Sequence, residues 1–250
     1  MAAPQTGRVT VEEGIVFGSG GGRDLRCDVY MPPQPGADRP GVLLIHGGGW
    51  VRGDRTQLRG YGILLGRLGY VCVATEYRLS GESKWPAQLH DVKAALRWMR
   101  ANAGRLGIDP DKIAVSGNSA GGHLSLMMAG TQNMPAFEGS GGNAGISTSV
   151  AACIAFYAPV RLAELYARFE DGFLPALFAP DATPETHAGA SPDRYAPNYP
   201  PVLLITGNKD ELVSYRESMH MYNALIEAGA RAELHLYEGA PHAFDALPDI

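Results

Sequence analysis

The chain has 250 residues, 45% of them hydrophobic and 19% charged, which is typical of a globular protein and not of a disordered one. Its length fits a single domain spanning residues 1–250. A formal net charge of -5, without any dense block of Lys and Arg, predicts no nucleic-acid partner and no binding to a membrane surface.

Cysteine usage and the N-terminus bear on the cellular compartment. Cys27, Cys72 and Cys153 are odd in number, far apart in the sequence and free of any Cys-x-x-Cys pair, so we expect buried free thiols. The first residues lack the basic and apolar regions of a signal peptide, and no later apolar run is long enough to cross a membrane. The expected location is therefore cytoplasmic, although a signal peptide that had already been removed would leave the same sequence.

Short apolar and β-branched runs alternate with helical patterns along the chain. The predicted strands cover residues 9–17, 25–30, 42–45, 71–75, 113–116, 150–156, 202–206 and 232–237. Apolar residues three and four positions apart predict helices over residues 57–68, 88–102, 120–129 and 215–228. This order predicts an α/β fold, with a mostly parallel eight-stranded sheet that carries helices on both faces. The first two strands would form an antiparallel hairpin with its loop at residues 18–22.

The pattern is looser over residues 131–200. A glycine-rich stretch at residues 139–145 and a proline-rich stretch at residues 179–201 interrupt one strand and a short helix near residues 162–169. We expect this region to contain a small lid or cap insertion.

Ser119 lies in the motif Gly117-Asn118-Ser119-Ala120-Gly121. The motif alone is a weak signal because 32 of the 250 residues are glycine. Its context is more specific, because a predicted strand runs into the motif and a predicted helix leaves it, as a nucleophile elbow requires. Glycines on either side remove β-carbons that would clash in so tight a turn. Ser119 is the predicted nucleophile.

Three consecutive glycines in His46-Gly47-Gly48-Gly49-Trp50 follow the third predicted strand. An acyl-transfer site needs backbone N–H groups aimed at the developing negative charge, and glycines let the chain approach closely. We expect the N–H groups of Gly48 and Gly49, together with that of Ala120, to form an oxyanion hole.

A serine nucleophile needs a histidine base and a carboxylate that orients it. In the chain order typical of this elbow the acid comes next and the histidine last. His242 follows the last predicted strand and is the predicted base. Asp210, after the seventh strand, is the predicted acid, with the adjacent Glu211 as its rival because adjacent side chains point in different directions.

Several motifs now support a family resemblance. They are His46-Gly-Gly-Gly-Trp50, Tyr77-Arg78-Leu79, Trp85-Pro86-Ala87, Gly117-Asn-Ser-Ala-Gly-Gly-His-Leu124, Gly207-Asn-Lys-Asp210 and Pro241-His242. Together they resemble carboxylesterases of the α/β-hydrolase superfamily, close to the hormone-sensitive-lipase and bacterial feruloyl/acetyl esterase branches, over residues 9–245. The resemblance implies the α/β-hydrolase fold, hydrolysis in two steps through an acyl-enzyme, no cofactor and short acyl chains. The family triad matches Ser119, Asp210 and His242, and its oxyanion hole matches Gly48, Gly49 and Ala120.

The sequence departs from this family at two places. Asn118 stands where lipase-like relatives often have Asp, which changes local hydrogen bonding more than chemistry. Only residues 243–250 follow His242, whereas relatives continue into a final helix. A homo-oligomer in which a second subunit covers that edge of the sheet is one hypothesis, and truncation of the chain is the alternative.

Other residues near these motifs have less specific interpretations. Trp50, Tyr77 and Trp85 are expected either to line the substrate pocket or to pack in the core beneath it. His46 and His123 are expected to support packing rather than to act as bases. No metal-ligand spacing occurs in the sequence, so no catalytic metal is expected.

The predicted function is hydrolysis of small-molecule carboxylic esters, with short-chain, acetylated or feruloylated compounds as substrates. An amide hydrolase such as an arylformamidase is the nearest alternative, because the same triad serves either leaving group. A non-catalytic binding module on this fold is a third hypothesis, disfavoured by the presence of His242.

Overall fold

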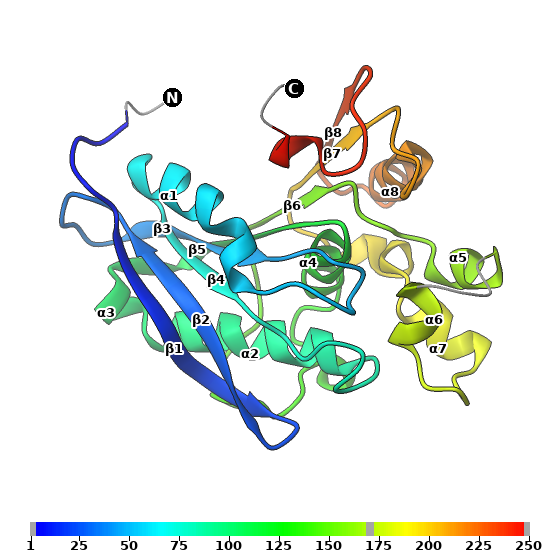
Figure 1. The fold of residues 1–250 in the computed structure, drawn as a ribbon, viewed down its shortest axis with the longest axis horizontal. Helices are drawn as coiled ribbons and strands as arrows, with labels where there is room; N and C mark the ends of the chain where they lie inside the picture. Colours follow the sequence, from blue (N-terminus) through cyan, green and yellow to red (C-terminus); the bar gives the residue numbers. More distant parts are fainter. Residues whose placement is uncertain (1–3, 169–172, 248–250) are drawn as a thin grey trace.

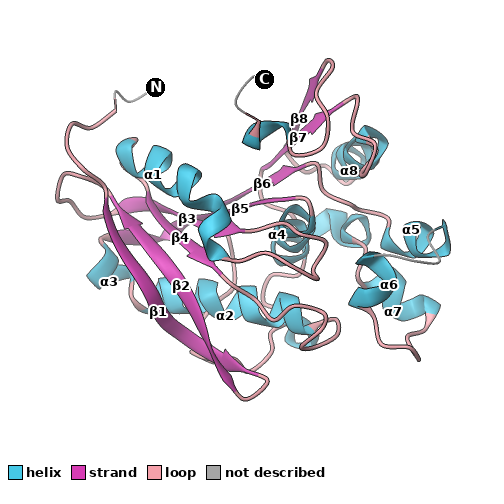
Figure 2. Ribbon diagram, in the orientation of Figure 1, coloured by secondary structure: helices cyan, strands magenta, loops and turns pink. Residues whose placement is uncertain are grey.

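The computed structural model describes residues 4–168 and 173–247. One eight-stranded sheet runs through the molecule in the order β1-β2-β4-β3-β5-β6-β7-β8, with helices on both of its faces (Figures 1 and 2). The strands are β1 (Thr10–Gly20), β2 (Arg23–Met31), β3 (Arg39–Ile45), β4 (Val71–Thr75), β5 (Ile108–Asn118), β6 (Ala152–Phe156), β7 (Val202–Gly207) and β8 (Ala232–Tyr237). From β4 through β3 and β5 to β8 all neighbours pair in parallel, whereas β1–β2 and β2–β4 are antiparallel. The predicted mostly parallel eight-stranded sheet with helices on both faces is confirmed.

Eight α-helices occur in the described part of the chain. They are α1 (Arg59–Arg67), α2 (Ala87–Ala101), α3 (Ala103–Leu106), α4 (Ala120–Gly130), α5 (Leu162–Arg168), α6 (Phe173–Leu177), α7 (Pro184–Gly189) and α8 (Tyr215–Glu227). Short 3₁₀ helices add η1 (Arg55–Leu58), η2 (Pro135–Phe137), η3 (Pro192–Asn198) and η4 (Phe244–Ala246). All four helices predicted from apolar spacing are present.

The two faces of the sheet carry separate hydrophobic cores. The smaller core joins Tyr30, Val42 and Cys72 to residues of α1, such as Ile63. The larger core joins the opposite face to α2, α4 and α8. Every residue of α4 is buried, which fits its run of alanine, glycine and apolar side chains with almost no charge. This helix therefore lies at the centre of the larger core, directly behind β5.

Strand boundaries differ from the prediction where polar residues extend a strand beyond its apolar run. β5 begins at Ile108, five residues before its apolar run, because Asp109, Asp111 and Lys112 continue the strand with polar side chains. The N-terminal hairpin is tighter than expected: Gly20 pairs with Arg23, which leaves Gly21 and Gly22 as the turn. Both glycines have positive φ angles, as two-residue hairpin turns require.

The region 131–200 divides into two parts on either side of β6. The part before β6 is tied to α2, where the buried Nζ of Lys93 donates to the Thr131 carbonyl at 2.6 Å and to Glu138 at 2.8 Å. The part after β6 holds α5, α6 and α7, which gather beyond α4 at one end of the molecule (Figure 1). Helix α5 matches the predicted short helix, whereas α6 and α7 were not predicted.

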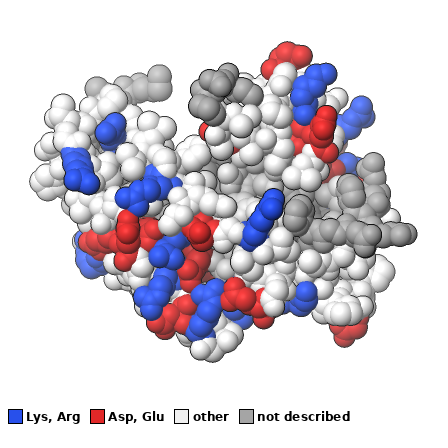
Figure 3. All heavy atoms as spheres, in the orientation of Figure 1, with Lys and Arg blue, Asp and Glu red and all other residues white. Residues whose placement is uncertain are grey.

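Charges of both signs are mixed on the surface seen in Figure 3, and the cysteines are buried. On the face seen in Figure 3, basic and acidic side chains alternate over β1 and β2 instead of forming a patch of one sign. Cys27, Cys72 and Cys153 are buried and free, as predicted. In the described part of the chain no helix combines the length and apolar character needed to span a membrane.

Candidate active site

The residues predicted to carry chemistry meet at the carboxyl edge of the sheet. Ser119 follows β5 directly, and Gly48 and Gly49 follow β3. Asp210 follows β7, and His242 lies in the loop after β8. Because parallel strands end at the same edge, residues up to 123 positions apart in the sequence come into contact.

Ser119 occupies the sharp turn between β5 and α4. Its φ and ψ angles of 53° and -121° are unusual for a residue with a β-carbon, and strain of this kind is common at functional sites. The turn is held by the Ser119 N–H, which donates to the Phe156 carbonyl at 2.9 Å, and by the His123 N–H, which donates to the Ser119 carbonyl at 3.0 Å. A β-carbon at Gly121 would lie 2.1 Å from the Ile45 carbonyl oxygen, so glycine is required beside the serine.

A chain of hydrogen bonds joins the side chains of Ser119, His242 and Asp210. Nε2 of His242 lies 3.0 Å from the Ser119 Oγ, and its Nδ1 lies 2.7 Å from Oδ2 of Asp210. Since a carboxylate only accepts hydrogen bonds, Nδ1 carries the proton and Nε2 is left to accept from the serine hydroxyl. The Asp210 side chain is fully buried, whereas 19% of the His242 side chain is exposed.

Two backbone groups fix the orientation of Asp210. Its Oδ1 accepts from the N–H of Leu212 at 2.9 Å and from the N–H of Val213 at 2.7 Å. The other oxygen is thereby directed at His242. Glu211 points elsewhere and lines the adjoining cavity, so the geometry selects Asp210 over its neighbour.

The loop after β3 places backbone N–H groups beside Ser119. Gly48 and Gly49 have φ angles of +110° and +61°, and a β-carbon on Gly48 would lie 2.1 Å from the Arg52 carbonyl oxygen. Both glycines and Ala120 line the same cavity as Ser119. Their N–H groups have no acceptor among the residues that the structure describes, so they are free to bind an anionic oxygen.

Buried side chains support this loop from behind. The Tyr77 ring stacks on His46 with centroids 4.3 Å apart, and its hydroxyl donates to the His46 carbonyl at 3.1 Å. Ser80 donates to the Trp50 carbonyl through its N–H at 2.8 Å and through its Oγ at 3.2 Å. Burial lowers the pKa of His46, so the ring is neutral and serves as packing.

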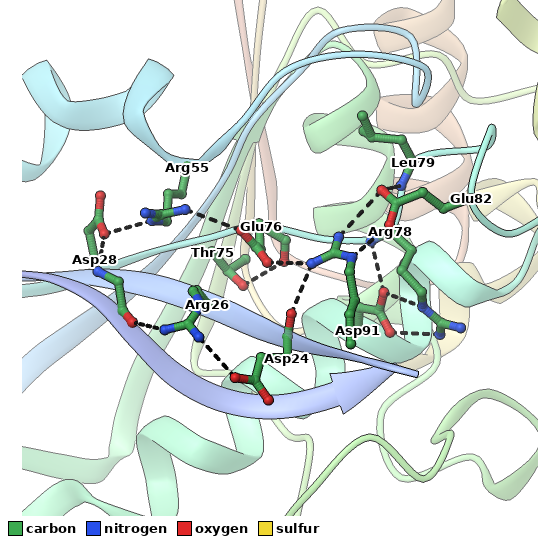
Figure 4. Close-up of polar contacts among 12 residues, drawn as sticks. Asp24, Arg26, Asp28, Arg55, Thr75, Glu76, Arg78, Leu79, Glu82 and Asp91 are labelled. Atoms are coloured by element: carbon green, nitrogen blue, oxygen red, sulfur yellow. Dashed lines mark hydrogen bonds and ion pairs between the residues drawn. The ribbon is translucent and has the colours of Figure 1, made fainter. Parts of the chain in front are cut away.

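Ion pairs anchor two segments to the scaffold: the glycine loop after β3 and the segment that carries Tyr77 and Arg78 (Figure 4). Arg55, at the far end of the glycine loop, donates to Asp28 at 2.7 Å and to Glu76 at 3.2 Å. Arg78, next to Tyr77, binds both oxygens of the buried Asp91 at 2.8 Å. These ion pairs therefore fix both segments against β2, β4 and α2.

A cavity of about 690 Å³ opens beside the Ser119 hydroxyl. Its wall is mainly apolar, with a few polar side chains. The lining residues are Gly47, Gly48, Gly49, Trp50, Arg52, Gln57, Asn118, Ser119, Ala120, Tyr157, Pro159, Leu165, Leu174, Glu211, Leu212, Val213, His242, Ala243 and Ala246.

Of the three aromatic residues predicted near the pocket, only Trp50 lines it. The expectation is wrong for Tyr77, which is 1% exposed and stacked beneath the glycine loop. It is also wrong for Trp85, which is partly buried and packs against the larger core, its ring centroid 5.6 Å from that of His123. For both residues the alternative of core packing is correct.

The sequence missed several lining residues. Tyr157 directly follows β6 and lies at the same edge of the sheet as the triad. Its position after a predicted strand, the signal that located His242, could therefore have identified it. Leu165 and Leu174 come from α5 and α6, where short helices carry too little periodicity to show which face is buried. Among the described residues, no cluster of three or more His, Cys, Asp or Glu side chains is arranged to hold a metal ion.

The chain is similar in sequence to curated esterases. The esterase LipC of Mycobacterium tuberculosis is 36% identical over 229 residues, which cover 87% of this chain and 55% of LipC. The esterase LipQ of the same organism is 34% identical over 244 residues, covering 92% of this chain and 56% of LipQ. The chain thus spans little more than half the length of these curated relatives.

A solved structure extends the likeness to the fold. Esterase 2 of Thermogutta terrifontis phosphoramylated by tabun matches with a TM-score of 0.78 and 29% identity, over 96% of this chain and 87% of that one. Residues 27–225 also match the family profile BD-FAE. The chain therefore belongs to the BD-FAE family, and the predicted resemblance to carboxylesterases of the α/β-hydrolase superfamily is confirmed.

Proposed function

We propose that this protein is a serine carboxylic ester hydrolase that works through an acyl-enzyme. The observation that carries the proposal is the continuous hydrogen-bonded chain from Asp210 through His242 to the Ser119 hydroxyl, which opens into the cavity. The esterase names of its relatives and the organophosphorus adduct of the Thermogutta enzyme support the same chemistry.

In the first step Ser119 attacks the carbonyl carbon of the ester. Nε2 of His242 accepts the hydroxyl proton as the new C–O bond forms, and Asp210 stabilises the resulting imidazolium through Nδ1–H. The carbonyl oxygen becomes an oxyanion, which accepts from the N–H groups of Gly48, Gly49 and Ala120. When the tetrahedral intermediate collapses, Nε2 returns the proton to the departing alcohol and leaves an acyl group on Ser119.

In the second step a water molecule takes the place of the alcohol. His242 accepts a proton from the water as it attacks the acyl carbon, and the same N–H groups hold the second oxyanion. Collapse of this intermediate releases the carboxylic acid and returns the proton to Ser119.

The cavity walls suggest how the substrate binds. Leu165 of α5 and Leu174 of α6 face the cavity from one side, and Leu212 and Val213 face it from the loop after β7. We infer that α5 and α6 form part of a cap over the site and that the substrates are small esters with short, acetyl or feruloyl acyl groups. Apolar walls with a few polar side chains are typical of such small-molecule sites.

The proposal is tested with purified protein, p-nitrophenyl acetate and formylkynurenine. Turnover of the ester that exceeds turnover of the amide supports an ester hydrolase, whereas the reverse order indicates an arylformamidase. Ser119→Ala is expected to abolish turnover, and Ser147→Ala, which changes an exposed serine in another part of the chain, is the matched control. Full activity of Ser119→Ala would refute the proposal.

A further inference from the structure

The carboxylate of Asp245 lies between two tyrosine hydroxyls. Tyr61 donates to its Oδ2 at 2.8 Å, and Tyr157 donates to its Oδ1. The three residues come from α1, from the end of β6 and from η4, three positions after His242. A single side chain thus ties the His242 loop to both neighbouring segments of the scaffold.

Both tyrosines are suited to remain donors. Burial and then the Asp245 carboxylate raise the pKa of the Tyr61 hydroxyl. Burial and then the hydrogen bond to Asp245 raise the pKa of the Tyr157 hydroxyl in the same direction. The phenols are therefore protonated donors near neutral pH, and hydrogen bonds to a carboxylate are the stronger kind.

Tyr157 also touches the imidazole of His242. The two ring centroids are 4.6 Å apart with an interplanar angle of 63°, an edge-to-face arrangement. Tyr157 has a φ angle of +36°, which is unusual for a bulky residue, and its N–H donates to the Ile205 carbonyl at 2.6 Å. A strained backbone of this kind persists only when surrounding contacts fix it, and the Asp245 bond is one of those contacts.

The His242 loop is held differently on its two sides. Before His242, the loop bonds to the segment after β7: Lys209 N–H donates to the Ala240 carbonyl at 3.1 Å, and Gly239 N–H donates to Asn208 Oδ1 at 2.9 Å. After His242, within the described residues, Asp245 makes the side-chain hydrogen bonds to the rest of the protein. Loss of Asp245 would remove these hydrogen bonds and leave that side of the loop with the aromatic contacts of Phe244 to Tyr157 and Tyr237.

We propose that Asp245 is a positioning residue which, through Tyr61 and Tyr157, holds the imidazole of His242 in line with Ser119. The inference rests on the proposed esterase function. Asp210 fixes Nδ1 of His242, and the hydrogen bond of Asp245 fixes the Tyr157 ring that packs against the imidazole. Proton transfer from Ser119 depends on this alignment, because small displacements of catalytic groups are costly.

The test uses diethyl p-nitrophenyl phosphate, which forms a bond from phosphorus to the Ser119 Oγ and releases p-nitrophenolate. The amplitude of the burst counts folded sites, and its rate constant measures how well His242 activates Ser119. We expect Asp245→Ala to keep a full amplitude while the rate constant falls on the order of 10- to 100-fold. In ester hydrolysis kcat should fall in parallel, and KM should stay close to the wild-type value.

Conservative variants separate alignment from stability. Asp245→Asn keeps the shape and one acceptor for a tyrosine, so it should recover part of the rate constant. Tyr157→Phe breaks the same connection, so its effect and that of Asp245→Ala should not add in the double variant. The matched controls are Asp193→Asn, which removes the charge of a carboxylate 2.8 Å from Nε2 of His220, and Tyr199→Phe, which loses a 3.1 Å bond to the Pro192 carbonyl. Both controls should react at the wild-type rate.

Each other outcome has a distinct meaning. A wild-type rate constant in Asp245→Ala, or a reduced amplitude with an unchanged rate constant, would overturn the positioning role and leave at most a role in stability. Additive effects in the double variant would overturn the connection through Tyr157. If folded wild-type protein gives no burst, the esterase proposal itself fails.

Discussion

Nδ1 of His242 lies 2.7 Å from Oδ2 of Asp210, while the carboxylate next to it in the sequence, that of Glu211, lines the cavity instead. Adjacent carboxylates therefore have different surroundings. Asp210 is buried and held by two backbone N–H groups. Glu211 is exposed, so only Asp210 is placed to fix the tautomer of the histidine.

This difference predicts unequal effects of two similar substitutions. Asp210→Asn should lower kcat by roughly 10⁴-fold, because an amide that donates to Nδ1 would favour the wrong tautomer of His242. Glu211→Gln removes the same charge from the cavity wall and should change KM more than kcat. Steady-state kinetics on p-nitrophenyl acetate measures both variants, and equal losses of kcat would contradict the assignment.

The glycine loop gives a second prediction. Gly48→Ala introduces a β-carbon 2.1 Å from the Arg52 carbonyl oxygen at a φ angle of +110°, so the loop must move away from Ser119. We expect kcat to fall about 10²- to 10³-fold, as when an oxyanion donor is lost. The control is Gly60→Ala in α1, where a β-carbon meets nothing within 4 Å and alanine favours the helix. Wild-type kcat in Gly48→Ala would exclude Gly48 from the oxyanion hole.

The sequence predicted those helices and strands whose pattern of apolar residues is clear within the segment itself. Strands such as β4, with five consecutive buried residues, were plain from apolar runs. Helix α7 was not, because it lies in a proline-rich stretch that suggested a loop. In fact Pro184 occupies its first turn, where no N–H is needed, and Thr183 with Thr186 forms a capping box.

The site residues, too, could be placed only where a pattern nearby in the sequence indicated their position. Ser119, Gly48, Asp210 and His242 could be placed because each lies directly beyond a predicted strand at one edge of the sheet. Tyr77 and Trp85 could not be placed, since whether an aromatic ring lines a pocket or supports it from behind depends on side-chain direction. The contact of Asp245 with Tyr61 joins positions 184 apart and has no local signal at all.

Ion pairs around the site give a third prediction, based on burial. Asp91→Ala leaves Arg78 without its buried partner and should lower the free energy of unfolding by about 3 kcal/mol or more. Glu82→Ala removes a half-exposed partner of Arg23 and should cost less than about 1 kcal/mol. Urea denaturation of both variants tests the difference. Similar losses would mean that the buried Arg78–Asp91 pair contributes no more to stability than the half-exposed Arg23–Glu82 pair.

The last prediction concerns His123, which is fully buried in α4 with its Nε2 bonded to the Ala190 carbonyl at 2.8 Å. Burial lowers the pKa of His123 to about 4, whereas an unfolded histidine titrates near 6.5. Between these values the unfolded chain binds a proton that the folded chain does not. This contribution to stability is therefore complete above pH 6.5 and is lost as the pH falls toward 4.

Free energies of unfolding measured at several pH values can isolate the contribution of His123. In the wild type, protonation linked to His123 alone should lower the free energy of unfolding by about 2 kcal/mol as the pH falls from 7.5 to 5. His123→Gln keeps a donor for the Ala190 carbonyl but does not titrate, so its stability should fall less over the same interval. His235→Gln, at a half-exposed histidine on the edge strand β8, is the control and should follow the wild-type curve. Parallel curves for wild type and His123→Gln would show that His123 does not stay neutral in the fold, because only a neutral, buried imidazole produces the predicted difference in slope.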